Sequence, residues 1–244
     1  MHETNSTDHA TDLDGTPGVA IVFGASGGIG MALSEALEAQ GRFAKVFRFS
    51  RSNSPGLDLT DETTIATVAR QVRDSGLTPR LMIDATGVLQ GDGCIAEKSW
   101  NQIDMAGMLR AFAINAVGPA LLIKHFLPLM PMHGRSVFVT LSARVGSIGD
   151  NRLGGWYSYR ASKAALNQIV RTAAVELRRK RPGAICVALH PGTVDTALSA
   201  PFQKSGLRVR APAVATQELL SVIGRLQPSD SGGLLDQHGE AIPW

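Results

Sequence analysis

The sequence has 244 residues, 44% of them hydrophobic, and a formal net charge of +3 at pH 7. This is enough apolar material for a buried core, and so mild a charge argues against a nucleic-acid-binding protein. The two cysteines fit a reducing compartment, and their spacing predicts no metal site. The basic run at residues 178–181 is more typical of a solvated helix end than of nucleic-acid contact.

The first 16 residues, MHETNSTDHATDLDGT, are polar and acidic. They offer almost nothing to bury, so we expect a mobile tail or a remnant of cloning. The stretch has no basic start and no apolar run, which argues against a secretory signal. No window approaches the ~18 continuous apolar residues of a membrane span. We therefore expect a polar tail over residues 1–16, one domain over residues 17–244, and a soluble cytoplasmic protein without membrane contact.

Short apolar runs alternate with helical periodicity along the rest of the chain. Strands are predicted at residues 18–23, 44–50, 80–85, 136–142, 184–190 and 232–236. Helices are predicted between them, at residues 24–41 after a glycine turn, 61–76, about 100–130, around Tyr159 and 211–224. Fully apolar strands separated by helices predict an α/β fold of the doubly wound Rossmann type, with a parallel sheet covered on both faces. Ligands bind such sheets at the carboxyl ends of the strands.

The first predicted strand is followed by the glycine-rich turn GASGGIG, residues 24–30. Glycines permit a tight turn and let backbone amides approach a phosphate at a helix N-terminus. A merely structural turn is the alternative. Its position after the first strand of an alternating chain favours phosphate binding.

The second predicted strand ends in RFSRS, residues 48–52, and no carboxylate follows until Asp58. An NAD site usually has an acid here for the ribose 2′-hydroxyl, whereas arginine offers a planar fork of donors for a 2′-phosphate. The sequence therefore predicts NADP as cofactor, with Ser50, Arg51 and Ser52 beside its ribose. A surface arginine on a loop is the alternative for Arg51, and more so for Arg48.

Two polar side chains stand out in apolar surroundings. Ser142 ends the fourth predicted strand, where a substrate carbonyl would lie, although a serine at a strand end is often only a turn former. Asn115 lies in FAINAVGPALL, just before Gly118 and Pro119. The proline removes a backbone donor and is expected to kink the helix. Asn115 is predicted to satisfy that broken hydrogen-bond ladder, to serve catalysis, or both.

The chain's only two tyrosines, Tyr157 and Tyr159, stand shortly before Lys163. Four residues of helix return to nearly the same face and six do not, so only Tyr159 can stand beside Lys163. An adjacent ammonium favours the phenolate and is expected to lower the pKa of the phenol from ~10, which suits an acid or base. The alternative is that one tyrosine caps the helix, the other packs in the core, and Lys163 is a surface charge.

These residues together resemble the short-chain dehydrogenase/reductase family from about Gly18 to Trp244. The matching motifs are GASGGIG, DLTD, Asn115, Ser142, Tyr159 with Lys163, and His190-Pro191-Gly192-Thr193. Within the family, YRASKAALN, HPGTVDT and GEAIPW resemble the branch of C-signal and sniffer-type carbonyl reductases.

The resemblance implies roles for the matching residues. Tyr159 would be the general acid for carbonyl reduction, and Lys163 would bind the nicotinamide ribose and depress the pKa of Tyr159. Ser142 would hydrogen-bond the substrate oxygen, and Asn115 would support a water that links Lys163 to solvent. The implied cofactor contacts are Gly24, Ser26, Gly28, Ile29 and Gly30 at the pyrophosphate, Asp58 and Leu59 at the adenine, Ala85, Thr86 and Gly87 in the turn after the third strand, and Pro191, Gly192, Thr193 and Val194 at the nicotinamide.

Three features depart from the family pattern. Residues 85–87 read Ala-Thr-Gly where Asn-Ala-Gly is usual, so support of that turn is expected to differ. Gly27 stands where many NADP enzymes of the family carry a basic residue, which leaves the NADP prediction resting on Arg51. Sixteen residues, 143–158, separate Ser142 from Tyr159, more than the dozen or so that is common. Because the segment is glycine-rich, we expect it to bulge as a loop over the site.

The leading interpretation is an NADP(H)-dependent oxidoreductase acting on a small carbonyl or alcohol substrate that the sequence does not identify. The alternative is a signalling or regulatory protein that binds the cofactor without turnover. Tyr157, beside Trp156, is expected to line the substrate mouth, to pack the loop against the helix, or to be purely structural. Apolar and small residues in ALNQIVRTAAVELRR, together with the resemblance, predict a homodimer or homotetramer built on this helix and the long one before it.

Overall fold

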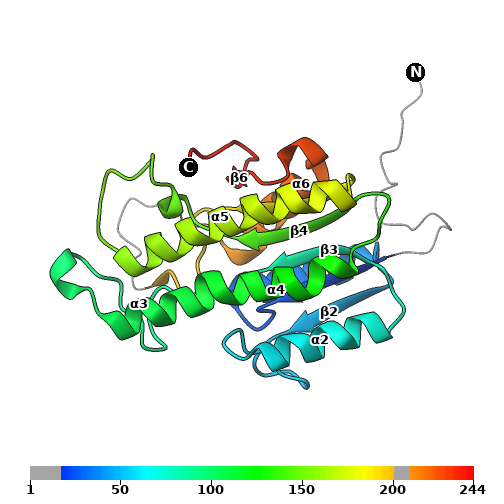
Figure 1. The fold of residues 1–244 in the computed structure, drawn as a ribbon, viewed down its shortest axis with the longest axis horizontal. Helices are drawn as coiled ribbons and strands as arrows, with labels where there is room; N and C mark the ends of the chain where they lie inside the picture. The colour runs from blue at the N-terminus through cyan, green and yellow to red at the C-terminus, as the bar shows by residue number, and fades with distance from the viewer. Residues whose placement is uncertain (1–17, 201–208) are drawn as a thin grey trace.

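The computed structural model describes residues 18–200 and 209–244, so the predicted N-terminal tail lies outside the described residues. The strands are β1 (Val19–Phe23), β2 (Lys45–Phe49), β3 (Pro79–Asp84), β4 (Ser136–Leu141), β5 (Ala184–Leu189) and β6 (Leu234–Leu235). In the described part of the chain they form one parallel sheet of order β2-β1-β3-β4-β5-β6 (Figure 1). The strand order reverses between β1 and β3, which opens a crevice at their carboxyl ends.

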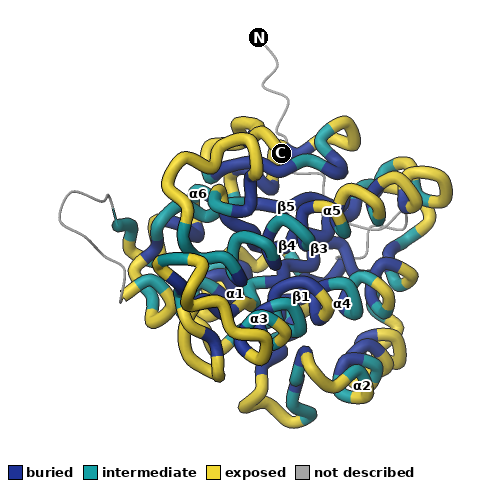
Figure 2. Tube along the Cα trace, turned by 60° about the vertical axis from the view of Figure 1, so that its left-hand side comes forward, coloured by how far each residue is buried: buried dark blue, intermediate teal, exposed yellow. Residues whose placement is uncertain are grey.

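The helices cover both faces of this sheet. They are α1 (Gly28–Gln40), α2 (Glu62–Asp74), α3 (Met105–Phe112), α4 (Gly118–Phe126), α5 (Tyr157–Lys180) and α6 (Pro212–Arg225). Alternate strand residues point to opposite faces, and β1 and β3 to β5 are buried along their length (Figure 2). One core cluster joins the sheet to α2, α4 and α5, and a second joins it to α1 and α6. The predicted doubly wound fold is therefore confirmed.

The long helix predicted at about residues 100–130 is interrupted. A 3-10 turn at Trp100–Gln102 precedes α3, and a π-helical turn at Ala113–Val117 separates α3 from α4. Pro119 lies in the first turn of α4, where its missing N–H costs little. The break thus falls where the proline predicted it. Wide π turns of this kind are frequent at functional sites.

The stretch Met105–Leu129 is long and apolar enough, with a hydropathy of 1.5, to pass a test for a membrane span by length and composition. Arg110, Asn115 and Lys124 interrupt this stretch, so it is not the continuous run of ~18 apolar residues that the sequence analysis looked for. The core helix of a globular domain passes the same test, and here Leu122 and Phe126 are fully buried against the sheet.

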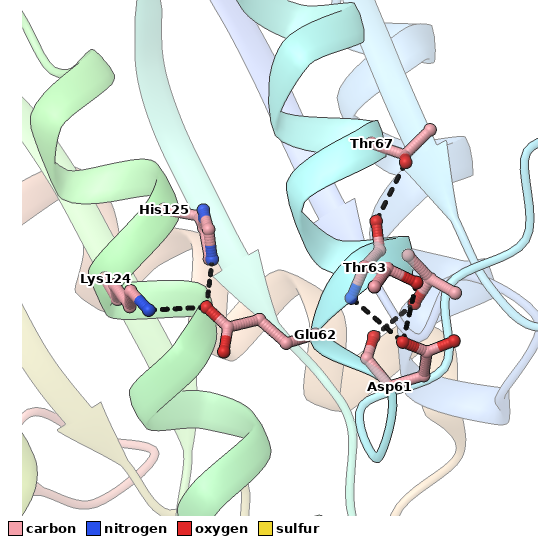
Figure 3. A network of polar contacts seen from close by, with 7 residues as sticks. Asp61, Glu62, Thr63, Thr67, Lys124 and His125 are labelled. Atoms are coloured by element: carbon pink, nitrogen blue, oxygen red, sulfur yellow. Dashed lines mark hydrogen bonds and ion pairs between the residues drawn. The ribbon is translucent and has the colours of Figure 1, made fainter.

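A polar contact ties the start of α2 to α4 (Figure 3). Asp61 caps α2 by accepting from the Thr63 backbone N–H at 2.9 Å. The neighbouring Glu62 carboxylate accepts from Lys124 Nζ at 2.6 Å and contacts His125 Nε2 at 2.7 Å. These contacts anchor the N-terminus of α2 to α4.

Both tyrosines lie within α5, which begins at Tyr157. The apolar stripe predicted on this helix packs into the core through Leu166, Val170 and Leu177. Ala174 is also a core residue, 1% exposed, so it is not among the small residues of this helix that a second helix could approach. Val175 is an exposed apolar residue of α5.

Candidate active site

The glycine turn is closely packed. Gly24 has φ +78°, a conformation that favours glycine, and a Cβ there would lie 3.0 Å from the Ala85 carbonyl oxygen. A Cβ on Gly30 would lie 2.1 Å from the Gly24 carbonyl oxygen, and one on Gly28 would lie 2.9 Å from Thr196 Cγ2. The first turn of α1 therefore presents backbone N–H groups without side chains in the way, which suits a phosphate.

A cavity of about 440 Å³ lies beside this turn. Its lining includes most of the predicted cofactor residues, namely Gly24, Ser26, Gly28, Ile29, Ser50, Arg51, Asp58, Leu59, Ala85, Thr86 and Gly87. Gly30, Ser52, Tyr159, Lys163 and residues 191–194 are not part of the lining, and neither are Asn115 and Ser142. Gly30 instead shapes the turn, and Ser52 bonds Ser50. The space at the end of β1 is open because the turn is made of glycines, whose added Cβ atoms would fill it. Such a space fits a dinucleotide.

Several lining residues escaped the sequence reasoning. They are Gly27, Leu57, Thr60, Val88, Leu89, Gln90, Asp92, Arg110, Ile114, Thr196, Ala197 and Leu198. Most belong to loops that follow β2, β3 and β5, so position at a strand end was the available signal. Asp92 and Arg110 carry charge, yet no local motif marks either one.

Arg51 lies at the mouth of the cavity. Its guanidinium is 72% exposed and forms an ion pair with Asp92 at 3.1 Å. Arg48 instead pairs with Glu38 of α1 at 2.5 Å, which favours the surface interpretation for that residue. Hydrogen bonds from the backbone N–H and hydroxyl of Thr60 hold the pKa of Asp58 below its ordinary value.

Lys163 is a buried residue, 3% exposed, so the surface-charge alternative is wrong. Its Nζ donates to the Leu141 carbonyl oxygen at 2.8 Å, at the carboxyl end of β4, and lies 6.0 Å from the centre of the Tyr159 ring. Burial lowers the pKa of Lys163 to about 8, and the carboxyl of Asp84 opposes that shift.

Tyr159 stands one helical turn before Lys163, as the spacing predicts. Burial raises the pKa of Tyr159 to about 12, although part of the residue is accessible to solvent. The predicted lowering of this pKa by the ammonium is therefore wrong for this arrangement, because the loss of hydration dominates and Lys163 is bonded to Leu141. Trp156 packs edge-on against Tyr159, with ring centres 6.2 Å apart.

Asn115 is fully buried in the π turn. Its Oδ1 accepts from the Val88 N–H at 2.8 Å, and its Nδ2 donates to the Val88 carbonyl at 2.8 Å and to Ser162 Oγ at 3.1 Å. The prediction that it satisfies its own broken helix ladder is wrong, because these bonds lead to the loop after β3 and to α5. Asn115 therefore joins the cavity wall to the helix of Tyr159.

Ser142 lies at the end of β4 and is 4% exposed. Its hydroxyl donates to Asn167 Oδ1 of α5 at 2.7 Å, and its backbone N–H donates to the Leu189 carbonyl. Asn167 was missed by the sequence reasoning. It follows Lys163 by one helical turn, which is the signal that could have found it.

The turn at residues 85–87 is supported by Asp84. This fully buried carboxylate accepts from the Thr86 N–H at 3.0 Å, the Thr86 hydroxyl at 2.5 Å and the Thr140 hydroxyl at 2.7 Å. Burial raises the pKa of Asp84. The turn is therefore held by the residue directly before it.

The long segment between Ser142 and Tyr159 forms a loop, as predicted, with Leu153 91% exposed. Arg160 holds both ends of it, since Nε donates to the Gly155 carbonyl at 2.9 Å and an Nη donates to the Val145 carbonyl at 3.2 Å. The loop accommodates the extra residues, and Ser142 keeps its backbone hydrogen bond to Leu189 of β5.

The segment after β5 turns at Gly192, which has φ +76°. Thr193 and Val194 pair with Arg210, whose N–H donates to the Thr193 carbonyl at 2.9 Å. Burial is the main reason that the pKa of His190 falls to about 4. In residues 18–200 and 209–244 there is no group of three His, Cys, Asp or Glu side chains that could hold a metal ion.

Curated relatives resemble this chain over much of its length. The C-signal protein of Myxococcus xanthus is 37% identical over 142 residues, which cover 58% of this chain and 81% of that protein. The 1-hydroxy-2-glutathionyl-2-methyl-3-butene dehydrogenase of Rhodococcus sp. (strain AD45) is 30% identical over 190 residues, which cover 78% of this chain and 79% of that enzyme.

Solved structures share the architecture. The NADPH-bound carbonyl reductase from chicken fatty liver has a TM-score of 0.81 and 25% identity, with 98% of each chain covered. The carbonyl reductase Sniffer of D. melanogaster has a TM-score of 0.79, with 94% of this chain and all of that chain covered. At 23% sequence identity, this structural likeness shows a common fold.

Residues 24–225 match the family model described as enoyl-(acyl carrier protein) reductase. That span runs from the glycine turn through β5 to the end of α6 and includes Tyr159 and Lys163. The family model covers most of the chain, and the Rhodococcus relative covers it at 30% identity. The chain therefore belongs to the short-chain dehydrogenase/reductase family of oxidoreductases.

Proposed function

We propose that the protein is an NADP(H)-dependent oxidoreductase that transfers hydride between the nicotinamide and a small carbonyl or alcohol substrate. The observation that carries this proposal is the placement of Tyr159 beside the buried Lys163, whose Nζ contacts Leu141 directly before Ser142. In support, Lys163 Nζ and Ser142 lie at the carboxyl end of β4, and the Tyr159 ring lies one helical turn before Lys163.

Tyr159 acts as general acid in reduction and as general base in oxidation. Its neutral phenol, kept protonated by burial, can give its proton to a carbonyl oxygen. The Ser142 hydroxyl, which here donates to Asn167 Oδ1 at 2.7 Å, would turn its proton from Asn167 to that carbonyl oxygen. Bound NADPH would supply the hydride, so the chain mainly positions the reactants and stabilises charge.

Lys163 would relay a proton from solvent to Tyr159, through a water that Asn115 supports. A Cβ built on Gly87 would lie 3.5 Å from Lys163 Nζ and 3.3 Å from Asn115 Oδ1, so both atoms face one small space beside this glycine. A water there would connect Lys163 to solvent. Because burial brings the pKa of Lys163 to about 8, the lysine can exchange protons near neutral pH.

The cofactor is NADP. The glycine turn would hold the pyrophosphate, Asp58 and Leu59 would contact the adenine, and Arg51 would meet the 2′-phosphate. In support, the end of β2 has no carboxylate before Asp58, and the chicken carbonyl reductase carries NADPH. Residues 191–194 would contact the nicotinamide, since they follow β5 beside β4.

The test measures NADPH oxidation by the purified protein with a panel of aldehydes and ketones, and separately measures NADPH and NADH binding by fluorescence. We expect turnover with at least one carbonyl and tighter binding of NADPH than of NADH.

The likeness to C-signal favours a second candidate, a signalling or regulatory protein that binds the cofactor. Tight NADPH binding without turnover of any carbonyl or alcohol would support that candidate.

We also propose that residues 17–244 form one domain of a cytoplasmic homodimer or homotetramer. Apolar side chains are exposed along the α3 region, with Met105 79% and Leu109 65% accessible, and Val175 is exposed on α5. A two-fold pairing of these helices would cover them. Light scattering should give at least twice the monomer mass of 25.8 kDa, and a monomer at micromolar concentration would refute this assembly.

A further inference from the structure

The helix that carries Tyr159 begins without a cap of its own. Trp156 at the N-cap position has φ 54° and ψ 43°, in the left-handed region, and its side chain makes no capping hydrogen bond. The first N–H groups of a helix have no partner inside the helix. Something outside α5 must therefore satisfy them at the turn that holds the catalytic tyrosine.

Glu97 supplies that partner from the loop between β3 and α3. Its carboxylate oxygens lie 3.2 Å and 3.3 Å from the Ser158 backbone N, and its Oε1 also accepts from the Ser158 hydroxyl. Its own backbone carbonyl accepts from the Trp156 N–H at 2.5 Å. Glu97 is 2% exposed, and a negative charge is favourable at the positive end of a 24-residue helix.

The backbone before α5 is shaped to admit this contact. Gly155 has φ +67°, and a Cβ there would lie 3.2 Å from the Glu97 carbonyl oxygen. Glycine therefore serves at this position both for its backbone conformation and for the close approach of Glu97. The same loop lines the cofactor cavity through Val88, Leu89 and Asp92.

We infer that Glu97 is a positioning residue that sets the place of the Tyr159 hydroxyl by anchoring the first turn of α5. Ser158 directly precedes Tyr159, so a shift of its backbone moves the phenol. Asn115 holds the same turn from the other side through Ser162, whose hydroxyl also donates to the Tyr159 carbonyl at 2.9 Å. The loop of the cofactor cavity is thus joined to the catalytic helix at two points, from Val88 through Asn115 to Ser162 and from Glu97 directly to Ser158.

This inference rests on the proposed function, because it assigns Glu97 a part in the same reaction. The test compares Glu97→Ala and Glu97→Gln with the unchanged protein and with Lys98→Ala, which alters an exposed neighbour. We expect kcat to fall on the order of tenfold to a hundredfold in Glu97→Ala, since small misplacements of a reacting group have effects of this size. KM for NADPH should stay within about twofold. Glu97→Gln, which keeps an acceptor for Ser158, should recover part of the loss.

A second measurement does not need turnover. In a Tyr157→Phe background Tyr159 is the sole tyrosine, so near-ultraviolet absorbance reports its ionisation alone. Adding Glu97→Ala should admit water to the first turn and bring the pKa of Tyr159 down from about 12 toward the ordinary value of ~10. If the parent protein turns over, an unchanged kcat together with an unchanged titration would overturn the role of Glu97. A parent protein without turnover would refute the proposed function. In that case the titration alone tests the anchoring, and a Tyr159 titration that Glu97→Ala leaves unchanged would overturn it.

Discussion

The two halves of the site are held together differently. Around β4 and α5, polar groups are buried and already bonded to one another, as in Ser142 with Asn167 and Lys163 with Leu141. Around β1 and β2, the cavity is lined by the glycine turn and by apolar side chains such as Ile29 and Leu57. An ion pair between two exposed side chains, Arg51 and Asp92, also belongs to its lining. Buried, satisfied networks fix geometry, whereas exposed pairs are weak and exchange easily. The polar groups of the proposed catalytic half therefore have buried partners, whereas the exposed Arg51–Asp92 pair of the proposed cofactor half can exchange with a ligand.

The sharpest test of the catalytic half is Tyr159→Phe. We expect kcat to fall by about 10²- to 10⁴-fold, the usual contribution of a general acid, while NADPH affinity is nearly unchanged. Tyr157→Phe is the matched control and should keep most activity, because position 157 is out of phase with Lys163. Steady-state kinetics with NADPH titrations by fluorescence provide both numbers. If Tyr157→Phe were the inactivating change, the catalytic assignment within this helix would be wrong.

Lys163→Met measures how much the buried Lys163 lowers the free energy of unfolding. The folded-state pKa of Lys163 is about 8 against an ordinary 10.5, so between these pH values the unfolded chain binds more protons and stability of the parent rises with pH. Below pH 8 the buried ammonium is a cost. We expect the variant to lose turnover yet gain about 2 to 3 kcal/mol in free energy of unfolding at pH 7, allowing for the lost bond to Leu141.

Urea denaturation at several pH values measures this gain, and Lys124→Met, an exposed lysine on α4, is the control. The gain should shrink as pH rises from 8 and be largely gone by about 10.5. A gain that is constant across this range would mean that packing, rather than the buried charge, is responsible.

In the cofactor half, Arg51→Ala should weaken NADPH binding by about 1.5 to 3 kcal/mol, the range for hydrogen bonds to charged groups. NADH binding should hardly change, because NADH has no 2′-phosphate. Arg48→Ala is the control, since Arg48 is engaged with Glu38. Equal losses for both cofactors would point to a different phosphate partner or to misfolding.

The smallest expected effect comes from Asp92→Asn. Asp92 competes with the 2′-phosphate for Arg51, so its removal should tighten NADPH binding up to about fivefold, as expected for an exposed pair worth ~0.2 to 1 kcal/mol. NADH binding should stay constant. Raising the ionic strength should diminish the difference, because salt screens exposed charges. A variant that binds NADPH more weakly would show that Asp92 assists rather than competes.

The sequence predicted the elements that depend on local pattern. Apolar runs located the strands of the sheet, glycines located the first turn, and helical spacing chose Tyr159 over Tyr157 as the neighbour of Lys163. Pro119 located the break in the long helix, although the form of the break is a π turn whose Asn115 bonds to Val88 and Ser162, residues distant in the chain. These features are set by residues close together in the chain.

Features that depend on distant residues could not be predicted in this way. Glu97 caps a helix that begins 60 positions later, and Asp92 meets Arg51 across the cavity mouth. The direction of the Tyr159 pKa was wrong for a related reason. Spacing shows which charge stands nearby, but burial, which decides the shift here, comes from the whole fold.

The packing of α6 against α1 has a consequence for biosynthesis. Leu33 and Leu37 of α1 are buried in a cluster completed by Leu219, Val222 and Ile223 of α6, near the other end of the chain. While the protein is being made, the first helix leaves the ribosome long before the helix that covers it. Its apolar face must remain uncovered for most of translation, so we expect the nascent chain to be a client of chaperones that shield exposed apolar helices.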